Sequence, residues 1–141
     1  MKAEKKINAE SFIKKLKASS SAEDRKNLSR YFKTGKGEYG EGDTFIGVSM
    51  GTVFKFAQEF IEMPPSEIEK MLKSPIHEIR AAALSVMSKQ ARRKKTSESR
   101  RKELFELYLR RHEKINNWDL VDVSCVYVVG GYLFDKSRSI L

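Results

Sequence analysis

Apolar residues recur at three- and four-residue spacing along most of the chain, which is the periodicity of amphipathic helices. The spacing predicts helices over residues 8–18, 21–32, 49–61, 67–72, 97–114 and 118–134, and one that begins at Pro75. Ser74 before Pro75 is a strong start signal, since proline fits the first position of a helix. No segment shows strand-like alternation, so the sequence predicts an all-α fold.

Six or seven helices joined by short turns fit a single domain over residues 1–141. Helix pairs recurring about every 40 residues suit a solenoid, although no sequence repeat is visible, and a compact bundle is the alternative. Residues 34–43 contain four glycines and are expected to form a loop.

Two side-chain placements follow from the helical pattern. In the helix over residues 49–61, Val53, Phe54, Ala57 and Phe60 are expected to face the core. His77 falls in the first turn after Pro75, and we expect it at the surface.

The charge distribution points to a polyanionic partner. The net charge is +9, and residues 89–111 alone carry ten Lys or Arg against three Glu. Lysines and arginines that neutralise phosphates give salt-sensitive, sequence-independent affinity, so we favour nucleic acid over a merely solvated face or an anionic membrane. The basic residues expected to contact DNA are Lys33 and Lys36, beside the glycine-rich loop, and Arg92, Arg93, Lys94, Lys95, Arg100 and Arg101.

Several classes of protein are disfavoured. The single cysteine, Cys125, forbids an internal disulfide. The two histidines, His77 and His112, do not have the spacing of zinc ligands, and we expect neither a metal nor a cofactor. The charged N-terminus has no apolar segment after it, and no stretch approaches the ~18 apolar residues of a membrane span. We expect a cytoplasmic, nucleoid-associated protein.

Residues 116–122 hold the only tryptophan and two carboxylates. If Asn117 caps a helix, Trp118 and Asp122 lie one turn apart on the same face. Asp122 lies in an otherwise apolar run, where a carboxylate is expected only if it has a charged partner or a catalytic role. From spacing alone, an ion pair with a neighbouring helix is favoured over a catalytic role.

These residues resemble a known family. The stretch Trp118-Asp119-Leu120-Val121-Asp122 is similar to the W-D-x-V-D signature of the DNA alkylation repair family, the HEAT-like-repeat alkylpurine DNA glycosylases. Residues 29–33 resemble its early aromatic segment. Residues 45–49 resemble its F-x-G-[IV]-x turn, and residues 74–87 its alanine-rich helix. The likeness covers nearly the whole chain in register.

The resemblance implies HEAT-like antiparallel helix pairs in a right-handed superhelix with a concave, basic, DNA-binding face. It implies binding of double-stranded DNA that carries alkylated bases, and hydrolysis of the N-glycosidic bond of cationic N3- or N7-alkylated purines. Asp122 would then stabilise the oxocarbenium-like sugar. Trp118 would contact the damaged nucleotide, and Tyr31 would supply a further aromatic near the lesion.

One departure from the family pattern is expected to matter. Family members continue for several helices after the W-D-x-V-D element, whereas this sequence ends at Leu141. We therefore expect a shortened solenoid with three open explanations: a fragment, a truncated gene product, or a protein that completes its solenoid by forming a homo-oligomer through its exposed C-terminal end. The alternative function is a non-catalytic helical-repeat module that binds DNA or protein, with Trp118 and Asp122 in structural roles.

Overall fold

The structure is a computed structural model that describes residues 7–21, 44–111 and 125–133. Its elements are α1 (Ala9–Ala18), α3 (Met50–Glu59), α4 (Pro65–Leu72), α5 (His77–Arg92), α6 (Glu98–Arg110), the π-helix η2 (Cys125–Gly130) and α8 (Gly131–Leu133). Within these ranges there is no β-strand, only an isolated bridge between Thr44 and Ile76. The all-α prediction is confirmed.

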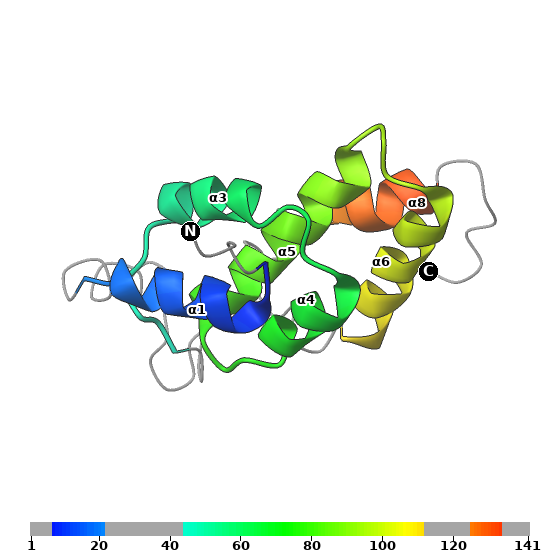
Figure 1. Cartoon of the computed structure of the whole chain (residues 1–141). Coiled ribbons are helices and arrows are strands. Elements are labelled where there is room, and N and C mark those ends of the chain that lie inside the picture. The colour runs from blue at the N-terminus through cyan, green and yellow to red at the C-terminus, as the bar shows by residue number, and fades with distance from the viewer. Residues whose placement is uncertain (1–6, 22–43, 112–124, 134–141) are drawn as a thin grey trace.

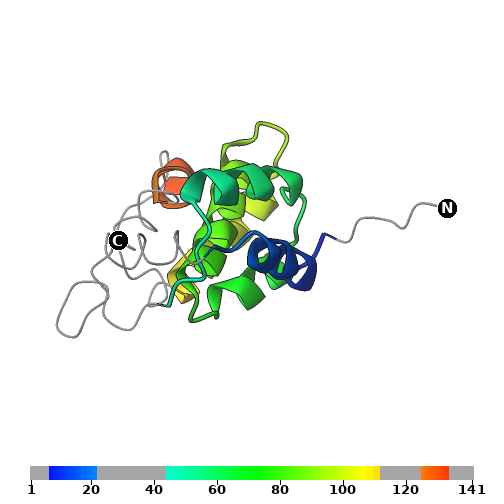
Figure 2. The ribbon, with the colours of Figure 1, turned by 90° about the vertical axis from the view of Figure 1, so that its left-hand side faces the viewer.

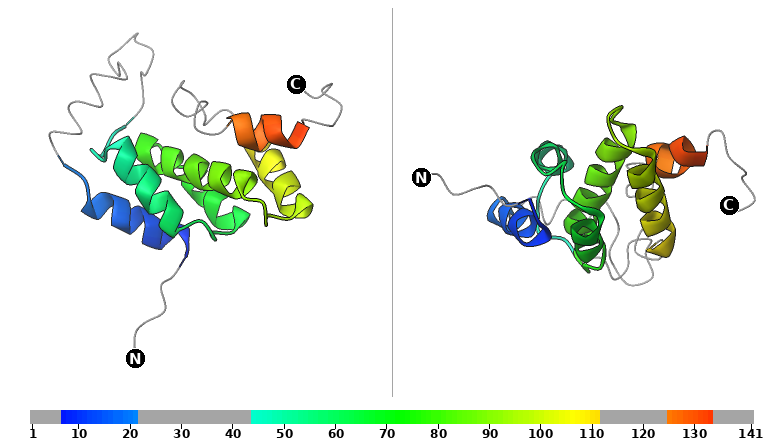
Figure 3. Two further views of the ribbon diagram at one scale, coloured as in Figure 1. Left: turned by 90° about the horizontal axis from the view of Figure 1, so that it is seen from above. Right: turned by 45° about the vertical axis from the view of Figure 1, so that its right-hand side comes forward.

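Helix α5 is the element around which the others pack. It contacts α1, α3, α4, α6 and η2 (Figure 1). Figure 2 views the molecule from the left-hand side of Figure 1. In this view α3 and α4 lie on different sides of α5, and α1 lies beside both. Helices α6 and α8 and the π-helix η2 lie at the other end of the molecule (Figure 3). The right-handed stacking of helix pairs stays a prediction.

Three predicted helix starts are confirmed by side-chain caps. The backbone N–H of Ser11 donates to Asn8 Oδ1 (2.8 Å), that of Thr52 to Ser49 Oγ (3.3 Å), and that of Arg100 to Ser97 Oγ (3.1 Å). Each bond satisfies one of the amides that a first helical turn leaves unpaired.

Two starts differ from the prediction. Helix α4 begins at Pro65 instead of residue 67, with proline at its first position. Helix α5 begins at His77 instead of Pro75, because the segment before it is extended and bonded elsewhere. The Ile76 amide donates to Ser74 Oγ (3.0 Å), and the His77 amide donates to the Thr44 carbonyl (2.8 Å).

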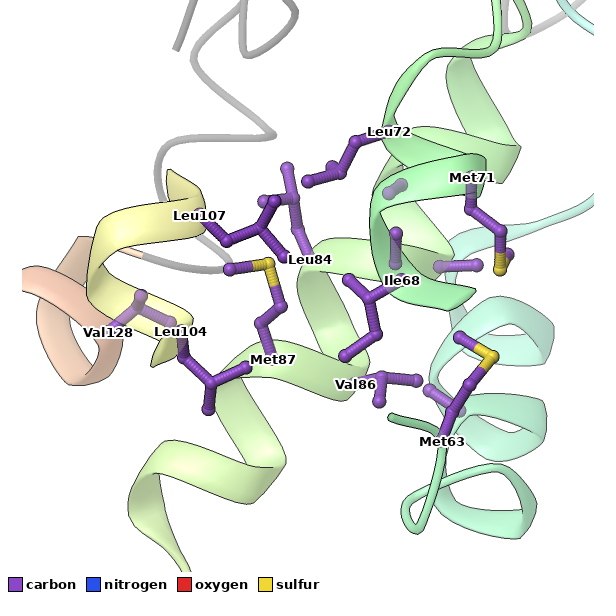
Figure 4. Close-up of a cluster of buried hydrophobic side chains, with 14 of the residues drawn as sticks. Met63, Ile68, Met71, Leu72, Leu84, Val86, Met87, Leu104, Leu107 and Val128 are labelled. Carbon is purple, nitrogen blue, oxygen red and sulfur yellow. The ribbon is translucent and has the colours of Figure 1, made fainter. Parts of the chain in front are cut away.

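The core is continuous from α1 to α8. Phe12 and Phe60 stack with ring centroids 4.4 Å apart. At the far end, side chains of three elements converge in Figure 4, namely Leu84 and Met87 of α5, Leu104 and Leu107 of α6, and Val128 of η2. The last helix was predicted over residues 118–134; its described part is π-helical before a short α-turn.

One prediction of a core residue, that for Phe54, is wrong. Phe54 is 38% exposed, whereas Val53, Ala57 and Phe60 are buried. These three follow one another at spacings of four and three residues, so they share one helical face, and Phe54 is rotated about 100° away from it.

A buried carboxylate joins α5 to the segment before α3. Glu78 is fully buried, and its Oε2 accepts the backbone N–H groups of Ile46 (3.1 Å), Gly47 (2.7 Å) and Val48 (3.1 Å). Gly47 has φ 87°, a conformation that side-chain-bearing residues rarely adopt and that aims successive amides at one anion. Glu78 also lies in the first turn of α5, where the helix dipole favours negative charge.

The neighbouring histidine corrects another expectation. His77 is fully buried, not at the surface, and its ring stacks on Phe45 with centroids 4.8 Å apart. The partners of His77 and Glu78 lie about 30 residues away in sequence, so helical periodicity could not reveal either burial.

We predict that Glu78→Ala lowers the free energy of unfolding by about 3 kcal/mol, because three backbone amides lose their acceptor in a buried place. Urea unfolding measures this. Glu78→Gln, which keeps one acceptor oxygen, should lose less, and the exposed Glu106→Ala should lose almost nothing. Equal losses for Glu78→Ala and Glu106→Ala would contradict the anchoring role.

Ion pairs connect the helices at the surface. Glu69 Oε2 of α4 accepts from Arg110 Nε (3.0 Å) and Arg111 Nε (2.8 Å) at the end of α6. Lys15 of α1 pairs with Glu59 of α3. The hydrogen bond from Arg110, helped by Arg111, lowers the pKa of Glu69 below its usual value of 4.5.

The lowered pKa gives a pH prediction. The stabilisation from Glu69 is fully present above pH 4.5 and is lost as the pH falls through the lowered pKa. Glu69→Gln should therefore cost about 1 kcal/mol at pH 7 and nearly nothing at pH 2. Unfolding curves of both proteins across this range test it; a difference that stays constant down to pH 2 would show that the carboxylate charge is not involved.

Candidate nucleic-acid interface

The predicted DNA-contacting residues of the described part gather where α5 ends and α6 begins. Arg92 closes α5, residues 93–97 form the turn that projects at the top of Figure 1, and Glu98 opens α6. The Thr96 amide donates to the Arg93 carbonyl (3.1 Å) and tightens the turn. Arg92, Lys94 and Lys95 are exposed, whereas Arg93, Arg100 and Arg101 are half-buried.

Arg101 holds the end of α5. Its guanidinium donates to the carbonyls of Ala91 (2.6 Å), Arg93 (2.8 Å) and Thr96 (3.3 Å). The Ala91 and Arg93 carbonyls lie at the end of α5, where helical acceptors have no partner within the helix, and the Thr96 carbonyl lies in the turn that follows. Arg101 thus has a structural function, and its contact with DNA stays a prediction.

Arg100 takes part in a second polar bridge. Its Nη1 donates to Oε1 of Gln90 (3.1 Å), a fully buried residue of α5. Gln90 Nε2 in turn donates to the carbonyls of Ile61 and Met63, both at 2.7 Å. This relay joins α6, α5 and the turn between α3 and α4.

Arg93 lies between two pockets. Its guanidinium forms an ion pair with Glu62, and this hydrogen bond lowers the pKa of the Glu62 carboxyl. The first pocket, about 240 Å³, is lined by Gln58, Ile61, Lys89, Arg92 and Arg93. The second, about 300 Å³, is lined by Glu62, Arg93, Lys95, Thr96, Ser97, Arg100 and Glu103.

The structure thus brings together six of the predicted DNA-contacting residues. It also adds Lys89, a basic residue that was not among the predicted DNA contacts. The signal was available, because Lys89 precedes Arg92 and Arg93 by three and four residues, the spacing of one helical face.

The other predicted site residues lie outside the described residues. These are Trp118, Asp122, Tyr31, Lys33 and Lys36. The chain re-enters the described part at Cys125, three residues after Asp122, in the π-helix η2. The π-helix η2 packs against both α5 and α6, the same pair of helices that carries the basic turn.

Two further observations concern the described residues. They contain no group of three or more His, Cys, Asp or Glu placed to hold a metal ion. Among them, no helix has the length and apolar character needed to cross a membrane.

Comparison with known proteins identifies the family. The model of the DNA alkylation repair enzyme family matches residues 12–141, nearly the whole chain. The chain belongs to the DNA alkylation repair family. No curated protein and no solved structure matches it significantly. Membership indicates a role in DNA repair with DNA as the partner, and the matched span includes Tyr31, Trp118 and Asp122.

We predict that Arg101→Ala costs this family member about 2 kcal/mol of unfolding free energy, because three carbonyls lose charge-assisted hydrogen bonds. Arg101→Lys should recover only part, since an ammonium lacks the planar fork of donors. The adjacent exposed Lys102→Ala makes the same charge change and should have little effect. Thermal or urea unfolding measures all three; a loss for Lys102→Ala as large as that for Arg101→Ala would contradict the structural role.

Proposed function

We propose that the protein binds duplex DNA and hydrolyses the N-glycosidic bond of cationic N3- or N7-alkylated purines. The observation that carries this proposal is the family match over residues 12–141, which spans the W-D-L-V-D element with Trp118 and Asp122. The dense positive charge of residues 89–111 supports DNA as the substrate.

The proposed reaction does not require the protein to supply a general acid. An alkylated purine already carries positive charge, so it departs with the electron pair of the glycosidic bond and becomes neutral without a general acid. Positive charge develops on the sugar as this bond breaks. A water molecule then forms the new bond to the sugar carbon and loses a proton, which leaves an abasic site and the free base.

Each proposed site residue has a physical role in this reaction. The Asp122 carboxylate stabilises the developing sugar cation, and such preorganised electrostatic stabilisation is commonly the largest catalytic contribution. Trp118 presents an aromatic face to the cationic nucleotide, worth about 1 kcal/mol. Tyr31 adds a second aromatic contact. Lys33, Lys36 and the basic residues between α5 and α6 contact DNA phosphates.

We predict that Asp122→Asn reduces the release of alkylated purine from methylated duplex DNA by about 10²–10³-fold, because the amide carries no charge opposite the sugar cation. Affinity for undamaged DNA should change little. Chromatographic detection of the free base measures the release. Asp119→Asn, the same substitution three residues earlier, is the matched control and should keep most of the activity.

Two outcomes would contradict the proposal. Equal release by wild type and Asp122→Asn would remove Asp122 from the chemistry. DNA binding by the wild-type chain without base release would favour the non-catalytic binding module, in which Trp118 and Asp122 are structural.

A further inference from the structure

The pocket between the ends of α3 and α5 is lined by cations and by no carboxylate. Lys89 and Arg92 of α5 and Arg93 just after it line the pocket together with Gln58 of α3 and Ile61 of the turn that follows α3. Its volume, about 240 Å³, is several times the ~30 Å³ that one water occupies in the liquid, so it has room for a tetrahedral oxyanion.

The pocket has charges of both signs around it. The C-terminal ends of α3 and α5 each carry about −0.5 of partial charge, which the basic side chains partly offset. Glu62 contributes one negative charge opposite Arg93.

We propose that this pocket binds a backbone phosphate of DNA through Lys89 and Arg92, and that Glu62 competes with the phosphate for Arg93. The inference rests on the proposed DNA binding and deepens it, because it names one phosphate subsite and an internal competitor. DNA is favoured over a free phosphate ion because the positive charge continues from Arg92 onto exposed Lys94 and Lys95, as successive phosphates of a strand require.

The position of Glu62 suits a competitor. Its side chain is 61% exposed while that of Arg93 is 23% exposed, so the carboxylate can leave the pair for water while the guanidinium stays at the pocket. An exposed ion pair of this kind is held weakly. A backbone phosphodiester, whose two non-bridging oxygens share one negative charge, can displace the carboxylate once it is bound to Lys89 and Arg92.

The first test measures the binding of an unmodified DNA duplex by fluorescence anisotropy over a range of salt concentrations. Lys89→Ala/Arg92→Ala should reduce the slope of log K against log salt by about 1 and weaken binding about tenfold at low salt, as the loss of one phosphate contact requires. Lys14→Ala/Lys73→Ala removes the same charge from exposed positions on α1 and after α4, and should change the slope much less. Lys73 lies at the other end of α5, whose 16 residues span roughly 24 Å.

The second test predicts a change in the opposite direction. Glu62→Gln frees Arg93 and should tighten DNA binding about threefold at low salt, a shift consistent with strengthening one phosphate contact. Glu10→Gln, at an exposed position of α1, adds the same net charge and should change the affinity much less.

The outcomes separate this inference from the proposed function. Equal effects within each matched pair, with DNA still bound by the wild type, would overturn the pocket and leave DNA binding intact. Absence of DNA binding by the wild type would overturn both. Base release and its loss in Asp122→Asn are measured separately and do not depend on the pocket.

Discussion

The bonds from three successive backbone amides to the Glu78 carboxylate fix how α3 sits on α5. The amides of residues 46–48 have no partners in a helix or sheet, and a carboxylate buried without donors would be strongly unfavourable. The carboxylate supplies the acceptor that the three amides need, and the amides supply the donors that the buried carboxylate needs. The dipole of α5 further stabilises the negative charge of Glu78. The positive φ of Gly47 is the backbone geometry that this exchange needs. The F-x-G-[IV]-x turn seen in the sequence is thereby explained by structure, not by catalysis.

The burial of α5 on nearly all sides determines where function can lie. Ala81, Ala82 and Ala83 are all buried, and such small side chains let several neighbours approach one helix. A helix covered in this way presents little surface except at its ends. At its N-terminal end Glu78 and His77 are enclosed, so the exposed charge of α5 is concentrated in its last turn, beside the basic connection to α6.

The sequence revealed what depends on near neighbours. At Asn8, Ser49 and Ser97 a side chain accepts from the amide three residues later, and the helix starts at these three positions were predicted. The burial of His77 and Glu78 was missed because their partners, Phe45 and residues 46–48, are distant in sequence. The resemblance identified the family, which the family model confirms, whereas the roles of Trp118 and Asp122 stay predictions. No hydrophobic pattern distinguishes a catalytic carboxylate from a paired one.

The basic cluster also shows why a count of charges overstates what is available to DNA. Arg101 donates to three carbonyls, Arg100 to Gln90, and Arg110 and Arg111 to Glu69. A planar guanidinium is suited to such sets of acceptors, whereas a lysine ammonium is a compact, strongly hydrated charge that tends to stay in water. The exposed Lys94 and Lys95 follow that division. The number of phosphates that residues 89–111 neutralise must therefore be smaller than their ten cations, and the salt dependence of DNA binding should reflect the smaller number.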